Sequence, residues 1–149
     1  MKEVARQLRA IVEKVLPRLS QMGRDDLDFK PAADEWSKKE ILGHLIDSAA
    51  NNHQRFVRAV SGVAAEFPAY DQTRWVRIQH YNQRPWDALV ALWSAYNHHL
   101  AHLIESIPAE AGSAPCNIGK KKPVPLDFVI NDYLRHLRLH LNDILGESI

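Results

Sequence analysis

Apolar residues recur at steps of three and four in four separate segments of this 149-residue chain. The segments cover about residues 2–22, 37–61, 85–107 and 126–145. Such spacing puts the apolar side chains on one face of an α-helix, so each segment predicts an amphipathic helix. No segment shows the alternation expected of a strand, and amphipathic helices bury their apolar faces by packing together. The sequence therefore predicts an all-α four-helix bundle.

Local signals mark where the predicted helices begin and end. Ser37 and Glu40 have the spacing of a capping box, in which both side chains bind free amide groups at a helix start. Gly62 favours the end of that helix just after residue 61, and Pro85 fits the first turn of the third helix. Pro17 lies near the end of the first helix, where it is expected to strain or kink the last turns.

The second and third helices have clear apolar stripes. In the second helix, the predicted buried residues are Ile41, Leu42, Leu45, Ile46, Ala49, Phe56, Val57 and Val60. In the third helix, they are Leu89, Leu92, Trp93, Tyr96, Leu100, Leu103, Ile104 and Ile107. His44 falls at the edge of the second helix's stripe, and it is followed at helical spacing by Ser48, Asn51, Asn52 and Arg55. This polar strip either faces solvent or lines a pocket between helices, and the sequence leaves both alternatives open.

The connection over residues 62–84 is the longest between predicted helices, and a second loop is expected over residues 109–125. The aromatic residues Phe67, Tyr70, Trp75 and Tyr81 argue against disorder in the longer one, which we expect to pack over one end of the bundle. A long middle crossover allows the second and third helices to run parallel, which predicts an up-down-down-up bundle, although long loops also join antiparallel neighbours. The chain length is that of one domain over residues 1–149.

Charge and hydropathy argue against several kinds of partner. Lys and Arg number 19 and Asp and Glu 18, a net charge of +1, so there is no charge excess for binding nucleic acid. No apolar run approaches the roughly 20 residues of a transmembrane helix, and the N-terminus lacks an apolar signal region. Cys116 is the one cysteine, which rules out an intrachain disulfide and a cysteine-rich zinc site. We therefore expect a soluble cytoplasmic protein that binds neither nucleic acid nor membrane.

The strongest chemical signal is His136-x-x-x-His140 in the fourth predicted helix. Histidines four residues apart lie on one helix face, about one turn apart, and can be directed at one metal ion. Because two imidazoles hold a metal weakly, a third ligand is needed, and His44 on the second helix is the candidate. Three protein ligands leave a coordination position open, as in catalytic zinc sites. Two partly buried histidines with hydrogen-bond partners show the same spacing, so spacing alone does not establish a metal site.

Three further histidines, His98, His99 and His102, lie on the third helix. At about 100° per residue they fall opposite or beside the core stripe. We expect ordinary surface histidines there, and an accidental or interface metal site is the alternative.

Ser48, Asn51, Arg55 and Trp75 are the candidates for a substrate pocket near His44. A guanidinium pairs well with carboxylates, so Arg55 suits an anionic substrate, and a surface salt bridge is the alternative. Ser48 and Asn51 either orient a ligand or expose polar groups of the helix to water. Trp75 either lines the pocket or anchors the crossover.

Asp47 and Asp143 are candidates to accept a hydrogen bond from a ligating imidazole. On helix geometry, each is equally well placed to face solvent or to form a salt bridge.

Three motifs occur in a fixed order along the chain: EWSKKEILGHLIDS at residues 35–48, PAYDQTRW at 68–75, and HLRLH at 136–140. They resemble, in turn, the start of the second helix, the crossover and the histidine pair of the fourth helix in the DinB/YfiT-like family of metal-dependent helical-bundle enzymes. The likeness is to the YfiT-like branch and spans about residues 30–145.

The resemblance implies an up-down-down-up bundle and a divalent metal ion, zinc or nickel, held by His44, His136 and His140. Relatives are hydrolases, or transferases and isomerases that use a low-molecular-weight thiol such as bacillithiol or mycothiol. It therefore implies a homodimeric enzyme, hydrolase-like or thiol S-transferase-like, that acts on a small-molecule substrate through an activated water or thiolate. The alternative is a non-catalytic helical module for dimerisation or ligand binding, with an empty or vestigial metal site. Asn142 and Asp143 stand where relatives can carry a further histidine.

Overall fold

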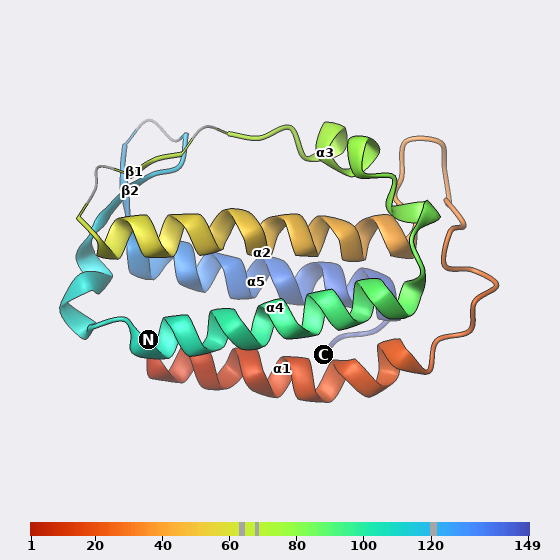
Figure 1. Ribbon diagram of the computed structural model, residues 1–149, viewed down its shortest axis with the longest axis horizontal. Helices are drawn as coiled ribbons and strands as arrows, with labels where there is room; N and C mark the ends of the chain where they lie inside the picture. The colour runs from red at the N-terminus through yellow and green to blue at the C-terminus, as the bar shows by residue number, and fades with distance from the viewer. Residues whose placement is uncertain (63–64, 68, 120–121) are drawn as a thin grey trace.

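Four long helices lie side by side in the computed structural model, which describes residues 1–62, 65–67, 69–119 and 122–149 (Figure 1). They are α1 (Lys2–Ser20), α2 (Lys38–Val60), α4 (Trp86–Ser106) and α5 (Leu126–Leu145). All four predicted helices are confirmed, and the limits of the last one agree with the prediction. Pro68, part of the second sequence motif, lies outside the described residues.

The helices follow one another in an up-down-down-up order. In Figure 1, α1 runs from left to right, α2 and α4 both run back from right to left, and α5 returns to the right. The long crossover therefore joins two parallel helices, as the length of the connection predicted. α2 packs against both α4 and α5, while α1 packs mainly against α4.

The helix starts and ends follow from local chemistry. Ser37 caps α2: its Oγ atom accepts a hydrogen bond from the Glu40 amide at 3.2 Å, and Glu40 Oε2 accepts one from the Ser37 amide at 3.0 Å. Gly62, with φ of +72°, follows the last turn of α2 and supplies the left-handed conformation that a side chain disfavours. α1 ends at Ser20, two residues before the predicted end and three residues after Pro17.

Three apolar residues predicted to be buried are exposed instead. Val57 and Val60 are 44% and 38% exposed because Phe56 and Ala59 occupy the buried positions in the last turns of α2. Leu92 is 46% exposed, since its neighbour Trp93 points into the core of the bundle.

The crossover contains secondary structure that the sequence did not predict. It holds β1 (Ala65–Glu66), α3 (Gln72–Gln79) and the 3-10 helix η1 (Tyr81–Gln83). The Asp71 carboxylate caps α3 by accepting a hydrogen bond from the Arg74 amide at 3.0 Å, and Val76 is the buried residue of this short helix. Figure 1 shows the crossover running along α2, so the prediction that it packs over one end of the bundle is wrong.

The expected loop at residues 109–125 also folds locally. It contains the 3-10 helix η2 (Ala109–Ser113), β2 (Pro115–Asn117) and β3 (Val124–Pro125). The three strands form a small sheet in the order β1-β2-β3, with β1 parallel and β3 antiparallel to β2. This sheet ties the start of the crossover to the α4–α5 connection.

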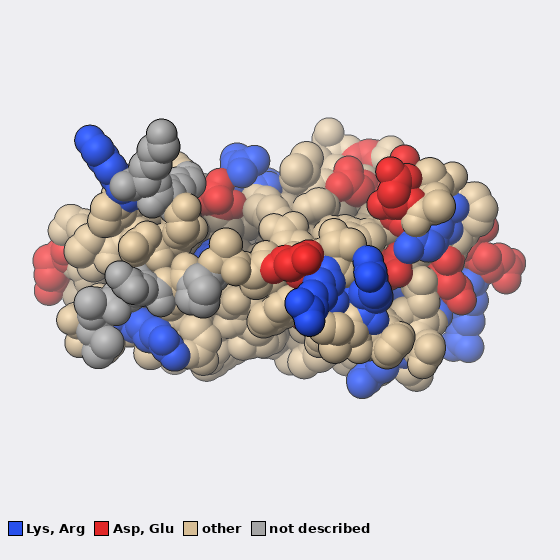
Figure 2. Space-filling model, turned by 90° about the horizontal axis from the view of Figure 1, so that it is seen from above, with Lys and Arg blue, Asp and Glu red and all other residues tan. Residues whose placement is uncertain are grey.

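Figure 2 shows basic and acidic side chains interspersed on the face that carries the crossover, with acidic groups gathered toward the end where α1 connects to α2. In the part of the chain that the structure describes, no helix combines the length and the apolar character needed to cross a bilayer.

Candidate metal centre

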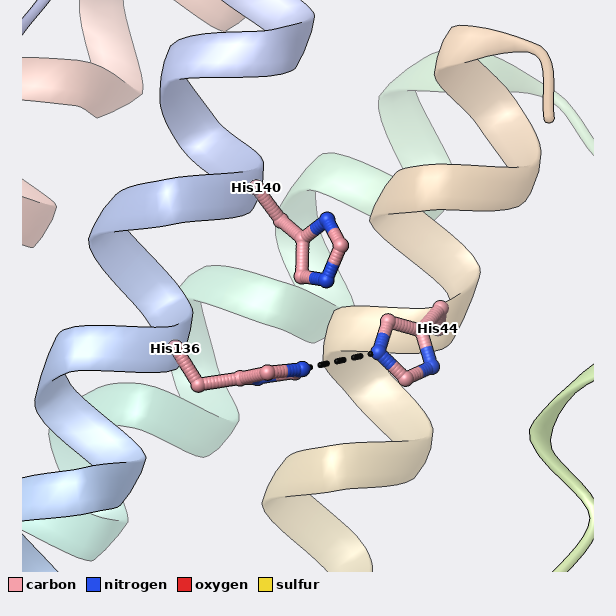
Figure 3. A group of neighbouring side chains, drawn as sticks. All are labelled: His44, His136 and His140. Atoms are coloured by element: carbon pink, nitrogen blue, oxygen red, sulfur yellow. Dashed lines mark hydrogen bonds between the residues drawn. The ribbon is translucent and has the colours of Figure 1, made fainter. Parts of the chain in front are cut away.

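His44, His136 and His140 meet between α2 and α5. Figure 3 shows the two α5 imidazoles pointing toward α2, where His44 faces them. The Nε2 atoms of His44 and His136 are 3.1 Å apart, and each of the three residues offers a nitrogen within 4.8 Å of the other two. The ring centroids are 4.6–5.0 Å apart. Residues that are far apart in sequence are therefore brought to one point by the packing of α2 on α5.

His44 is fully buried, which corrects the prediction that it lies at the edge of the α2 stripe. The residues from Leu42 to Ala49 are all buried, because α2 is covered by α4, α5 and the crossover. Ser48 and Asn52 are also buried, so most of the polar strip predicted on α2 faces the interior.

Burial sets the charge state of these histidines. It lowers the pKa of His44 to about 3, with repulsion from His136 and His140 adding to the effect. It also lowers the pKa of His136 to about 4, again with repulsion from His140. Both imidazoles are therefore neutral at pH 7, the form in which a ring nitrogen donates its lone pair to a metal.

The spacing of the donor atoms suits a divalent cation. Two nitrogens that bind one tetrahedral zinc ion at about 2.0–2.1 Å lie about 3.3 Å apart, close to the 3.1 Å between His44 and His136. The Nδ1 atoms of both rings are buried without a hydrogen-bond partner among the described residues, and the two Nε2 atoms, which face each other, are the ones placed to share a metal ion. Three imidazoles are also a donor set that zinc and nickel accept. The residues present therefore fit a divalent ion.

Two neighbours hold the cluster in place. The His140 Nδ1 atom lies 3.1 Å from Asp143 Oδ2, which is the contact that the orienting role considered for Asp143 requires. Trp36, half-buried just before the α2 cap, covers the cluster with its ring 4.8 Å from that of His44 and 6.5 Å from that of His140. No role was predicted for Trp36 beyond its place in the first motif, although its position next to the capping box puts it beside His44.

Asp47, the other carboxylate considered for this role, forms no hydrogen bond with an imidazole of the described residues. Its Oδ1 atom accepts hydrogen bonds from Gln79 Nε2 at 2.6 Å and from the Tyr81 hydroxyl at 2.8 Å. Burial raises the pKa of Asp47, and these two hydrogen bonds partly offset that effect. Asp47 therefore fastens the crossover to α2 one turn beyond His44.

A cavity of about 140 Å³ opens beside His136. Two of the predicted pocket residues, Ser48 and Arg55, line it. Its remaining lining residues come from the crossover, the small sheet region, α2 and α5: Asn52, Tyr70, Gln72, Ile118, Val129, Asp132 and Tyr133. A small molecule in this cavity would lie against a candidate metal ligand.

The other two predicted pocket residues, Asn51 and Trp75, line a different groove of about 530 Å³ between α2 and the crossover. Trp75 is 38% exposed there and packs on Tyr70 with the ring centroids 4.8 Å apart. Tyr70 borders both the groove and the cavity. The structure thus separates the predicted pocket into two spaces that share one wall.

The histidines on α4 are exposed, in agreement with the sequence prediction. His99 packs against His53 of α2, with the ring centroids 4.9 Å apart, and His53 Nδ1 lies 3.2 Å from the Tyr96 hydroxyl. Among the described residues, only His44, His136 and His140 form a group of three or more potential ligands.

Comparison with known proteins agrees with this geometry. The sequence pattern of the DinB superfamily matches residues 7–144. The chain is similar to the structure of YfiT from Bacillus subtilis, a probable metal-dependent hydrolase with an unusual four-helix bundle topology. The two share 19% identity with a TM-score of 0.81, covering 99% of this chain and 91% of that one. No curated protein sequence matches this chain.

A second similar structure is a mycothiol-dependent maleylpyruvate isomerase, with 17% identity, a TM-score of 0.75 and 97% of this chain covered. A variant of that isomerase matches with 16% identity and a TM-score of 0.76, covering 100% of this chain and 62% of that one. The chain spans about 60% of the isomerase's length. At these identities the structural likeness establishes the fold.

Proposed function

Because this chain belongs to the DinB superfamily, we propose that it is a metal-dependent enzyme that acts on a small molecule through His44, His136 and His140. The observation that carries the proposal is the approach of three imidazoles, two of them held neutral, beside a cavity that His136 helps to line. We propose zinc or nickel as the ion, although imidazole nitrogens also bind iron and cobalt.

The residues of the cluster and its neighbours have separate roles in the proposed reaction. When bound, a divalent ion supplies Lewis acidity, lowering the pKa of a water or thiol ligand and polarising a substrate oxygen. His44 and His136 present Nε2 lone pairs from opposite helices, and Asp143 orients His140. Trp36 covers the cluster from outside, which limits the access of water to the three rings. Three protein ligands leave room for a fourth, and the cavity at His136 is where a substrate would approach.

The reaction is a hydrolysis or a thiol S-transfer. YfiT supports the first possibility, and the mycothiol-dependent isomerase supports a low-molecular-weight thiol as cosubstrate. The cavity of about 140 Å³ admits a small molecule in either case.

Elemental analysis of protein purified without a histidine tag tests the metal. We expect about one equivalent of zinc or nickel in the wild type and in His98→Ala, which removes an exposed histidine from α4. His136→Ala should lose the metal while keeping its helical circular dichroism spectrum. Absence of metal from the wild type after reconstitution with zinc and with nickel would overturn the proposal.

Substrate panels then separate the two reactions. A hydrolase should act without added thiol, whereas a thiol transferase should require one and show saturation with respect to it. Activity that persists in His136→Ala would belong to a contaminant or to a different site.

A further inference from the structure

One charged side chain in the cavity beside His136 forms no ion pair with another described residue. Arg55 lines this cavity together with His136, and a guanidinium remains protonated in proteins. The ion pairs among the described residues do not include Arg55. The side chain is half-buried, so water satisfies it less completely than it would on the surface.

Two contacts fix the position of this guanidinium without neutralising it. Arg55 Nη1 lies 3.4 Å from Asn52 Oδ1, and the Phe67 ring centre lies 5.9 Å from Arg55 Cζ. A guanidinium has five N–H donors, and these contacts involve one of them. Arg55 is therefore oriented by its neighbours and keeps donors for a further acceptor.

Two further polar groups that α5 contributes to the lining are already paired. Asp132, the carboxylate in the lining, binds the Nη2 and Nε atoms of Arg135 at 2.7 and 3.1 Å. The Tyr133 hydroxyl donates a hydrogen bond to Asn97 Oδ1 at 2.6 Å. Among the described side chains of this lining, Arg55 thus carries a charge that no ion pair within 4.0 Å compensates, and Asp132 attracts it only at longer range.

We propose that the cavity selects a small carboxylic acid, with Arg55 binding the carboxylate while the reacting end of the molecule lies at His136. The planar guanidinium matches a carboxylate in a two-pronged hydrogen-bonded pair. A volume of about 140 Å³ is below the roughly 300–1,000 Å³ of the pockets that hold drug-sized ligands, so the acid is a short one. The position of the reacting end rests on the proposed function, but the contact between the carboxylate and Arg55 can be tested independently.

The first experiment compares a charged probe, 3-mercaptopropionate, with an uncharged one of similar size, 3-mercaptopropionamide, by calorimetry on the zinc-loaded protein. We expect the acid to bind the wild type at least tenfold more tightly than the amide. Arg55→Gln should bind both equally, and Arg55→Lys should keep part of the preference. Arg58→Gln, which removes an exposed arginine of the same helix, should keep all of it.

The second experiment uses metal-free protein labelled with ¹⁵N-arginine. The acid should shift the Nε–Hε resonance of Arg55, identified by its absence from Arg55→Lys, and the amide should leave it in place. Stoichiometric zinc binding with equal affinity for acid and amide would overturn this inference and leave the proposed function standing. A shift specific to the acid, in protein that binds no zinc, would uphold the contact with Arg55 and remove the proposed function.

Discussion

The Nδ1 atom of His140 lies 3.1 Å from the Oδ2 atom of Asp143, three residues further along α5. A carboxylate at Nδ1 favours the tautomer with its proton on that nitrogen, which leaves the Nε2 lone pair available to a metal. Asp143 therefore prepares His140 as a ligand before any ion arrives. Because the carboxylate is half-exposed, the contact is weaker than a fully buried one.

Asp143→Ala should weaken zinc binding about tenfold, the low end of the 10–100-fold range typical of such supporting residues. Competition with a fluorescent zinc chelator measures the affinity. Glu147→Ala is the matched control, since it removes an exposed carboxylate near the end of α5 that pairs with Arg18 instead of a histidine. Equal affinities for Asp143→Ala and the wild type would show that the contact with His140 does not tune the site.

The metal-free protein should lose stability as the pH falls below about 6.5. His44 and His136 have pKa values of about 3 and about 4 in the folded protein, against 6.5 as the ordinary value. Between these values the unfolded chain binds more protons, so protonation favours unfolding. The loss is at most about 1.4 kcal/mol per pH unit for each histidine, and it ends near pH 4 for His136 and pH 3 for His44.

Urea unfolding in the presence of a chelator, at pH 7, 6 and 5, measures this dependence. His136→Gln should reduce the slope of the unfolding free energy against pH, while His98→Gln, on the exposed face of α4, should leave it unchanged. A wild-type stability that is flat from pH 7 to 5 would mean that the cluster opens to accept protons without unfolding.

Much of the bundle was predictable because local signals agree with the tertiary packing. The reciprocal hydrogen bonds of Ser37 and Glu40 can be predicted from a segment of four residues. Helical periodicity alone predicts that His136 and His140 lie on the same face of α5. The length of the crossover favoured the observed order of the helices without determining it, since a long connection allows α2 and α4 to run parallel but can also join antiparallel neighbours.

The predictions from sequence were wrong or incomplete at positions whose burial depends on packing against several elements at once. Helical periodicity places His44 beside an apolar stripe, but it does not reveal that α4, α5 and the crossover together cover it completely. α3 was missed because its one buried residue, Val76, gives no periodic pattern. The division of the predicted pocket, with Arg55 in the cavity and Trp75 in the groove, depends on the path of the crossover, and no local signal determines that path.

Gly43→Ala should destabilise the protein because of a close approach between α2 and Tyr81. A Cβ atom at residue 43 would lie 2.1–2.5 Å from three carbons of the Tyr81 ring. Alanine gains about 1 kcal/mol of helix propensity over glycine, but overpacking of this kind costs about 1–3 kcal/mol, and such short distances favour the upper end. We expect a net loss of about 1–2 kcal/mol in urea unfolding.

Gly23→Ala is the control, since nothing lies within 4 Å of a Cβ at that position. A Gly43→Ala variant as stable as the wild type would mean that the Tyr81 ring moves aside freely. The hydrogen bond between Tyr81 and Asp47 would then not fix the crossover.

Asp47→Asn should be neutral or stabilising at pH 7, although it alters a buried group that accepts two hydrogen bonds. Burial raises the pKa of Asp47, so the folded protein binds its proton more tightly than the unfolded chain does. Ionisation of the buried carboxylate therefore lowers the free energy of unfolding as the pH rises above about 3.8. The asparagine amide does not ionise, and its oxygen still accepts hydrogen bonds from Gln79 and Tyr81. Urea unfolding at pH 7 and pH 4 should show that the stability of Asp47→Asn relative to the wild type increases as the pH rises. Asp47→Ala, which removes both contacts, should lose about 1–3 kcal/mol of unfolding free energy at pH 7. A destabilised Asp47→Asn variant would mean that the charge itself holds the crossover to α2.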